Sequence, residues 1–157
     1  TQGCLRALDR LDTEGFKGLN VADIGCGTAV LAMGAARIWP NPALAGDIDP
    51  VAVEVAAANV KVNDLDGRVK CVVAAGFGAP ELEAAAPFDL VFANILKGPL
   101  IDLAPDMASN LQDGGYAILS GILNEQADEV IAVYAQNGIN LAYREEIGEW
   151  TTLTLKK

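Results

Sequence analysis

The 157-residue chain contains no histidine, and this absence excludes several catalytic mechanisms. Hydrolases that activate serine or cysteine with a histidine base cannot operate within such a chain. The three cysteines, Cys4, Cys26 and Cys71, are scattered and lack the spacing of metal ligands. We therefore expect no metal site. The odd, dispersed thiols also favour a reducing cytoplasmic compartment.

Basic residues are scarce. Eleven Lys and Arg stand against 21 Asp and Glu, which gives a net charge of −10 at pH 7. Because binding to nucleic-acid backbones depends on clustered Lys and Arg, we expect no direct contact with nucleic acid. An acidic surface suits either a basic protein partner or solubility alone, and composition does not distinguish these two.

Long apolar runs and a signal peptide are also missing, so we expect no membrane association. With 52% hydrophobic and 20% charged residues, the chain is expected to form one globular domain over residues 1–157. The chain begins at Thr1 rather than at methionine. We therefore expect it to be a fragment or a trimmed form of a longer polypeptide.

Helical and strand patterns alternate along the chain. This order predicts an α/β fold with a doubly wound, mostly parallel seven-stranded sheet. The tight turn at Gly148 makes the terminal strand pair antiparallel. Expected helices cover residues 2–12, 29–38, 50–63 and 100–111, and a further helix starts at Asn124 and ends at Gly138; expected strands cover 19–24, 43–48, 69–74, 88–93, 116–122, 139–147 and 150–155.

The most informative segment is 21–29, where an apolar strand runs into a glycine turn and then a helix. Gly25 and Gly27 permit positive φ and let a ligand approach bare backbone, and the helix directs free N–H groups at it. A dinucleotide fingerprint requires a third glycine where this chain has Val30, and Ala29 takes the small position instead. Taken alone, the motif is equally compatible with an ordinary strand-to-helix turn.

Acidic residues end the first two strands. Asp23 lies at the end of a buried strand, where an unpaired carboxylate is costly and would repel a pyrophosphate. The ammonium and sulfonium of S-adenosylmethionine suit such a site. Asp47 stands 20 positions after Gly27, the spacing at which an acid binds ribose hydroxyls. Asp49 precedes Pro50 and is expected to cap the following helix.

Asn94 ends the fourth predicted strand. Ligands of doubly wound sheets bind at the carboxyl ends of the strands. Asp23, Asp47 and Asn94 are therefore expected to form one site. The alternative for Asn94 is a turn former without a chemical role.

Four segments of the chain resemble the ribosomal protein L11 methyltransferase family. The first of them is common to most class I methyltransferases, whereas the Asn-Ile-Leu and Ser-Gly-Ile-Leu sequences are far more specific. The resemblance covers nearly the whole chain. The segments are Asp-Ile-Gly-Cys-Gly at 23–27, Gly-Asp-Ile-Asp-Pro at 46–50, Ala-Asn-Ile-Leu-Lys-Gly-Pro-Leu at 93–100 and Leu-Ser-Gly-Ile-Leu at 119–123.

This resemblance implies a Rossmann-like domain that uses S-adenosylmethionine to methylate lysine side chains and an α-amino group of ribosomal protein L11. By position, it places Gly25 and Gly27 at the methionine part of the cofactor and Asp47 at the ribose. It places Asn94 where cofactor and acceptor meet, as the catalytic candidate. Thr1 matches the last threonine of a segment that helps close the cofactor site.

The chain departs from the family pattern in two ways. The rest of that closing segment and the N-terminal substrate-recognition domain are missing, so we expect this chain to be unable to recognise its substrate alone. Ala29 replaces the commoner glycine, which is a mild change. Three alternatives stay open: a methyltransferase of this fold with another acceptor, a nicotinamide-dependent oxidoreductase, and a module that only binds the cofactor.

Other residues near these motifs are expected to be structural. Phe77 and Phe92 are expected in the core rather than stacked on adenine, and Trp150 is expected to pack rather than contact a ligand. Cys26 is expected to be a small filler of the glycine turn rather than a nucleophile. The amide oxygen of Asn94 is able to accept a hydrogen bond from an acceptor amine. No residue is predicted as a dedicated base.

Overall fold

The computed structural model describes residues 1–157 and confirms the alternation of helices and strands. The elements, in chain order, are α1 (Gln2–Thr13), β1 (Val21–Ile24), α2 (Val30–Ile38), β2 (Ala43–Asp47), α3 (Pro50–Val62), β3 (Val69–Val73), α4 (Pro80–Ala85), β4 (Phe88–Asn94), α5 (Lys97–Asp102), α6 (Ala104–Asn110), β5 (Leu111–Leu123), the 3₁₀ helix η1 (Asn124–Gln126), α7 (Ala127–Gln136), β6 (Asn140–Ile147) and β7 (Trp150–Lys156).

The seven strands form one sheet in the order β3-β2-β1-β4-β5-β7-β6. The strands from β3 to β5 are parallel, and β7 runs antiparallel between β5 and β6. The predicted fold class is therefore confirmed. In this order β1 lies between β2 and β4, with Asp23 paired to Ala45 on one side and Phe92 on the other. The carboxyl ends of these three strands consequently lie next to one another.

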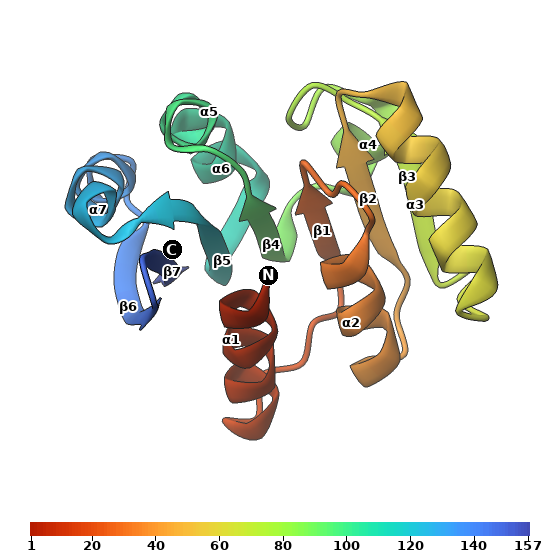
Figure 1. The fold of residues 1–157 in the computed structure, drawn as a ribbon, viewed down its shortest axis with the longest axis horizontal. Helices are drawn as coiled ribbons and strands as arrows, with labels where there is room; N and C mark the ends of the chain where they lie inside the picture. The colour runs from red at the N-terminus through yellow and green to blue at the C-terminus, as the bar shows by residue number, and fades with distance from the viewer.

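Helices cover both faces of the sheet (Figure 1). On one face, α1, α2 and α3 pack their apolar stripes against residues such as Leu90, Phe92 and Ile118. On the other face, α4 to α7 pack against Val91 and Leu119. Both Phe77 and Phe92 are buried in these cores, as expected. No helix is long and apolar enough to cross a bilayer.

The start of α3 is the predicted one. Asp49 Oδ1 accepts a hydrogen bond from Val51 N at 2.9 Å, and Pro50 occupies the first helical turn. A proline there loses no helical hydrogen bond, because the first N–H groups of a helix have no partner within it. This cap fixes the turn that follows β2 and therefore the position of Asp47.

The expected helix over 100–111 is wrong in detail. The structure has two short helices, α5 and α6, which meet at Leu103. Pro105 lacks the N–H that would bond to the carbonyl of Ile101 in a continuous helix. The chain therefore ends α5 and begins α6 at this point. The next strand also starts earlier than expected, at Leu111 rather than at 116.

Asn124 does not cap the helix that follows it, contrary to the prediction. Its Nδ2 donates to Gly148 O at 3.0 Å, and its Oδ1 accepts from Thr151 Oγ1 at 2.8 Å. The amide is therefore used to tie the end of β5 to the turn between β6 and β7. Because Asn124 opens η1, α7 itself begins only at Ala127.

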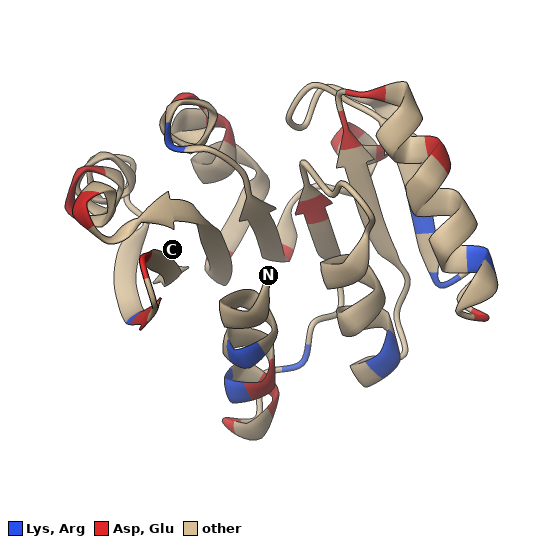
Figure 2. Ribbon diagram, viewed as in Figure 1, with Lys and Arg blue, Asp and Glu red and all other residues tan.

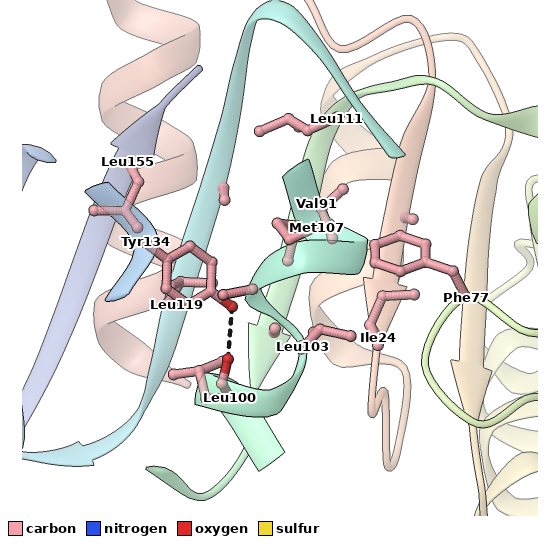
Figure 3. Packing of buried hydrophobic residues seen from close by; sticks show 14 of the residues in the cluster. Ile24, Phe77, Val91, Leu100, Leu103, Met107, Leu111, Leu119, Tyr134 and Leu155 are labelled. Carbon is pink, nitrogen blue, oxygen red and sulfur yellow. Dashed lines mark hydrogen bonds between the residues drawn. The ribbon is translucent and has the colours of Figure 1, made fainter. Parts of the chain in front are cut away.

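Tyr134 links α7 to α5 in the core on the face of the sheet that α4 to α7 cover (Figure 3). Its hydroxyl is fully buried and donates to Leu100 O at 2.9 Å. We expect Tyr134→Phe to lower the free energy of unfolding by ~1 kcal/mol, because the carbonyl of Leu100 loses its partner. Urea unfolding of both forms measures this difference. An unchanged midpoint would show that the hydrogen bond adds no net stability.

Candidate active site

Three adjoining cavities open at the carboxyl ends of the strands. The first, called the large cavity, is lined by Asp47 and Ile95 among others and measures about 490 Å³. The second, called the Trp150 cavity, is lined by Thr1, Asn94, Ile95, Leu96, Ser120, Gly121 and Trp150 and measures about 330 Å³. The third, called the Asp23 cavity, is lined by Thr1, Asp23, Gly25, Cys26, Gly27, Thr28, Val30, Leu31 and Asn94 and measures about 180 Å³. Acidic residues mark the ends of β1 and β2 at this edge, whereas most basic residues of α1, α2 and α3 lie toward the opposite edge (Figure 2). The edge is therefore electrostatically suited to a cationic ligand.

The glycine turn after β1 has an unusual backbone. Gly25, Gly27 and Ala29 all have positive φ, at +69°, +53° and +60°. The N–H of Gly25 donates to Gly46 O at 2.8 Å, and the N–H of Gly27 donates to Asp47 Oδ2 at 2.9 Å. A Cβ at Gly27 would meet no atom within 4 Å, so this glycine leaves open space beside the backbone. The turn thus presents bare main chain to the Asp23 cavity.

Asp23 lies beneath this turn and is only 1% exposed. Its Oδ2 accepts a hydrogen bond from Ala32 N at 3.1 Å, and no other hydrogen bond reaches the carboxylate. Burial raises the pKa of Asp23 from 3.8 to about 7, and the nearby Asp47 carboxylate adds to this rise. A buried carboxylate with a free oxygen beside a cavity is the arrangement that a cationic group stabilises.

The Asp23 cavity also borders the N-terminus of α2, through Val30 and Leu31. First-turn N–H groups of a helix have no partner within it and favour an anion. The cavity therefore combines a carboxylate for a cation with a helix N-terminus for an anion. This pair of features fits the ammonium and carboxylate of an amino acid.

Asp47 lies at the mouth of the large cavity. Its Oδ2 accepts from Gly27 N and its Oδ1 accepts from Asp49 N at 3.0 Å. These two bonds fix the orientation of the carboxylate. Each oxygen keeps a second lone pair, so the carboxylate remains able to accept from the hydroxyl groups of a ribose.

We expect Asp47→Asn to weaken cofactor binding by ~1–3 kcal/mol, the scale of a lost charged hydrogen bond. The asparagine side chain keeps one oxygen, which still accepts a hydrogen bond from the backbone of the turn. Its second oxygen is replaced by an NH2 group, which donates and therefore no longer accepts from a ribose hydroxyl. Isothermal titration calorimetry measures the change, and Asp49→Asn serves as a control because its side chain caps α3 instead. An unchanged dissociation constant for Asp47→Asn would contradict the ribose role.

The large cavity is mostly apolar, as the binding of a flat aromatic base requires. Sequence reasoning missed most of its lining, because these residues come from loops and helix starts with no motif of their own. Phe77, expected in the core, packs against Phe88 at 6.1 Å between ring centroids and does not line this cavity. The lining residues are Ile24, Gly25, Asp47, Ile48, Ala74, Ala75, Gly76, Ile95, Leu96, Pro99 and Leu103.

Asn94 borders both the Asp23 cavity and the Trp150 cavity. Its Nδ2 lies 3.4 Å from Thr1 Oγ1, and its Oδ1 has no hydrogen-bond partner. Thr1 lines the same two cavities. The structure therefore brings together all six predicted site residues: Thr1, Asp23, Gly25, Gly27, Asp47 and Asn94.

Trp150 was expected to pack, and this prediction is wrong. The side chain is 53% exposed and lines the cavity that carries its name. Trp150 is the first residue of β7, next to the Gly148 turn, so it lies at the rim of the sheet rather than under a helix.

Cys26 matches its expected filler role, because its side chain is buried. Burial raises the pKa of its thiol to about 12, so the thiol stays protonated at neutral pH and does not act as a nucleophile.

A family model described as ribosomal protein L11 methyltransferase (PrmA) matches residues 1–157. The chain belongs to this family. A ribosomal protein L11 methyltransferase from Bradyrhizobium diazoefficiens is 45% identical over 157 residues, which cover 100% of this chain and 53% of that protein. One from Brucella melitensis biotype 2 is 43% identical and is covered to 54%. The chain thus spans about half the length of the curated relatives it matches.

Two solved structures share the fold of this chain, and one of them is an L11 methylase. A ribosomal protein L11 methylase from Lactobacillus delbrueckii subsp. bulgaricus superimposes with a TM-score of 0.80 at 29% identity, covering 96% of this chain and 76% of that one. An O-methyltransferase family protein from Burkholderia thailandensis gives 0.79 at 16% identity, covering 99% of this chain and 55% of that one. The second likeness shows the fold alone.

Proposed function

We propose that this chain is the part of an L11 methyltransferase that binds S-adenosylmethionine and transfers its methyl group to amino groups of a protein. The observation that carries the proposal is the buried carboxylate of Asp23, whose free oxygen borders a cavity beside the glycine turn. Family membership supports the same cofactor.

The residues of the site fit the three parts of this cofactor. Asp23 would bind the ammonium of the methionine part, and the N-terminus of α2 would bind its carboxylate. Asp47 would accept hydrogen bonds from the ribose, and the apolar wall of the large cavity would hold the adenine. Thr1, next to Asn94, would cover the methionine part from the acceptor side.

The bound cofactor supplies a methyl group on a positively charged sulfur. The chain's own contribution is to align the acceptor and to exclude water. Asn94 Oδ1 would accept a hydrogen bond from the acceptor nitrogen and direct its lone pair. Because a lysine has an ordinary pKa of ~10.4, it must first lose a proton to water. The apolar surroundings of Leu96 and Trp150 favour the neutral amine by desolvation.

Ribosomal protein L11 is the proposed acceptor, and lysine side chains and an α-amino group are its proposed target groups. The names of the relatives support this acceptor, and the net charge of −10 suits a basic protein. We propose that the remaining half of the family's polypeptide supplies recognition of L11. The cytoplasm, where ribosomal proteins are made, is the proposed compartment.

The test uses the complete polypeptide that carries this chain. It is incubated with S-adenosylmethionine labelled in the methyl group and with L11, and separately with an unrelated basic protein of similar size. We expect label in L11 alone, located on lysine and α-amino nitrogen by mass spectrometry. Label on the other protein only would point to a different acceptor, and no transfer at all would leave cofactor binding as the sole activity.

A further inference from the structure

Ile95 lies where the proposed adenine cavity and the proposed acceptor cavity meet, next to Asn94. It lines the large cavity and also the Trp150 cavity, directly after Asn94 in the chain. Its side chain is partly buried and packs against the core beneath the sheet. Leu96 borders the same two cavities but is 70% exposed, so it belongs to their rim. Ile95 is therefore the inner wall between them.

Two glycines from neighbouring strands enclose Ile95. A Cβ on Gly25, after β1, would overlap Ile95 Cγ2. A Cβ on Gly121, in β5, would overlap the carbonyl oxygen of Ile95 and lie 2.9 Å from its carbonyl carbon. Ile95 follows β4, which runs between these two strands. Its side chain thus contacts Gly25 on the cofactor side, and its main chain contacts Gly121 on the acceptor side.

A positive φ is one reason for a glycine at position 121, and the contact with Ile95 is a second. Gly121 has φ +84°, and Gly138 has φ +79° with no atom within 4 Å of an added Cβ. The backbone conformation alone thus accounts for a glycine at 138, whereas at 121 the space is filled by Ile95. The close approach on two sides leaves Ile95 little freedom to shift.

We propose that Ile95, held between Gly25 and Gly121, is a positioning residue that sets the distance and angle between the acceptor nitrogen and the methyl group. This inference rests on the proposed function. In the transfer, the nitrogen lone pair forms the N–C bond as the C–S bond breaks, and the electron pair of that bond stays on sulfur. The acceptor has already lost its proton to water. The rate therefore depends on the direction from which the acceptor nitrogen approaches the methyl group, and Ile95 bounds that approach on one side.

Two substitutions at Ile95 separate shape from bulk. Ile95→Leu conserves volume but removes the Cγ2 that contacts Gly25, whereas Ile95→Val keeps Cγ2 and removes only the terminal methyl group. Misplacing a reacting group by about 1 Å lowers the rate of a reaction by up to ~100-fold. We therefore expect Ile95→Leu to lower kcat by at least about tenfold. We expect Ile95→Val to stay within about threefold of wild type. For both variants, KM for L11 and the dissociation constant of the cofactor should change less than about threefold.

Gly121→Ala and Gly138→Ala form the matched pair for the main-chain contact. Both place alanine at a similar positive φ and strain the backbone alike, but only the first displaces Ile95. We expect Gly121→Ala to lower kcat further than Ile95→Leu and Gly138→Ala to lower only the melting temperature. The complete polypeptide is used throughout, with L11 and labelled cofactor.

The outcomes distinguish this inference from the proposed function. Wild type that transfers methyl groups, with Ile95→Leu equally fast, would overturn the positioning role and leave the function intact. A loss of catalytic efficiency that comes wholly from KM or from the cofactor dissociation constant would also overturn it. Such a loss would show that Ile95 affects binding and not the transfer step. Wild type without any transfer would overturn the proposed function itself.

Discussion

Replacing Asp23 with asparagine should stabilise the ligand-free chain at pH 8. Burial raises the pKa of this carboxyl to about 7, above its ordinary 3.8. Below pH 3.8 the group is neutral in both the folded and unfolded states and costs nothing. Between 3.8 and 7 the unfolded state loses the proton first, so stability falls as pH rises and levels off above pH 7. The full cost reaches ~4 kcal/mol, since one pKa unit corresponds to 1.36 kcal/mol.

Asparagine keeps an oxygen for Ala32 N and carries no charge, so it avoids this cost. The gain of Asp23→Asn in the free energy of unfolding should be ~2–3 kcal/mol larger at pH 8 than at pH 5. Denaturant titrations at the two pH values measure the difference. A gain that is equal at both values would show that Asp23 titrates at its ordinary pKa.

The same substitution should weaken binding of S-adenosylmethionine by ~10–100-fold, because the ammonium loses its charged partner. Asp89→Asn is the matched control. Asp89 is 4% exposed, and burial also raises its pKa, but it accepts N–H groups of Leu19 and Asn20 rather than bordering the site. Its replacement should leave cofactor affinity unchanged. Tight binding by Asp23→Asn would remove the electrostatic basis of the site.

The second large effect is expected at Asn94. We expect Asn94→Ala in the complete polypeptide to lower kcat by ~100-fold, the scale of removing one oriented polar group from an active site. The dissociation constant of the cofactor should change by less than about threefold, because the proposed cofactor contacts come mostly from other residues. Single-turnover assays with labelled cofactor and L11 measure the transfer step, and calorimetry measures cofactor binding.

Asn94→Asp separates the role of the oxygen from that of the amide. Aspartate keeps an acceptor for the substrate amine but loses the Nδ2 that lies 3.4 Å from Thr1 Oγ1. It should therefore retain more activity than alanine. Equal rates for wild type and Asn94→Ala would show that Asn94 only forms the turn at the end of β4 and has no role in the transfer.

The convergence of Asp23, Asp47 and Asn94 was predictable from the sequence. Each residue ends an apolar strand, and helices between the strands force a parallel sheet in which these ends share one edge. The strand order places β1 between β2 and β4, so the three residues meet as expected. The capping role of Asp49 was also predictable, because a short polar side chain before proline has a local signature.

Features that depend on long-range packing were not predictable. The alternation of Trp150, Thr152 and Thr154 gives no sign that the tryptophan lies at the rim while the threonines are buried. The threonine face is covered because α1 packs on β7, where Gly3 lies against Thr152. Asn124 resembles a helix cap in sequence, yet the turn at Gly148 competes for its amide. The enclosure of Ile95 likewise needs three strands brought together.

Calorimetric titration of this chain with S-adenosylmethionine at pH 6 and pH 8, with NADH as the comparison, tests the proposed cofactor site most directly. We predict one molecule of S-adenosylmethionine bound per chain, more tightly at pH 8, where Asp23 is ionised, and no binding of NADH. Absence of binding by S-adenosylmethionine at both pH values, or binding of NADH in its place, would contradict the account.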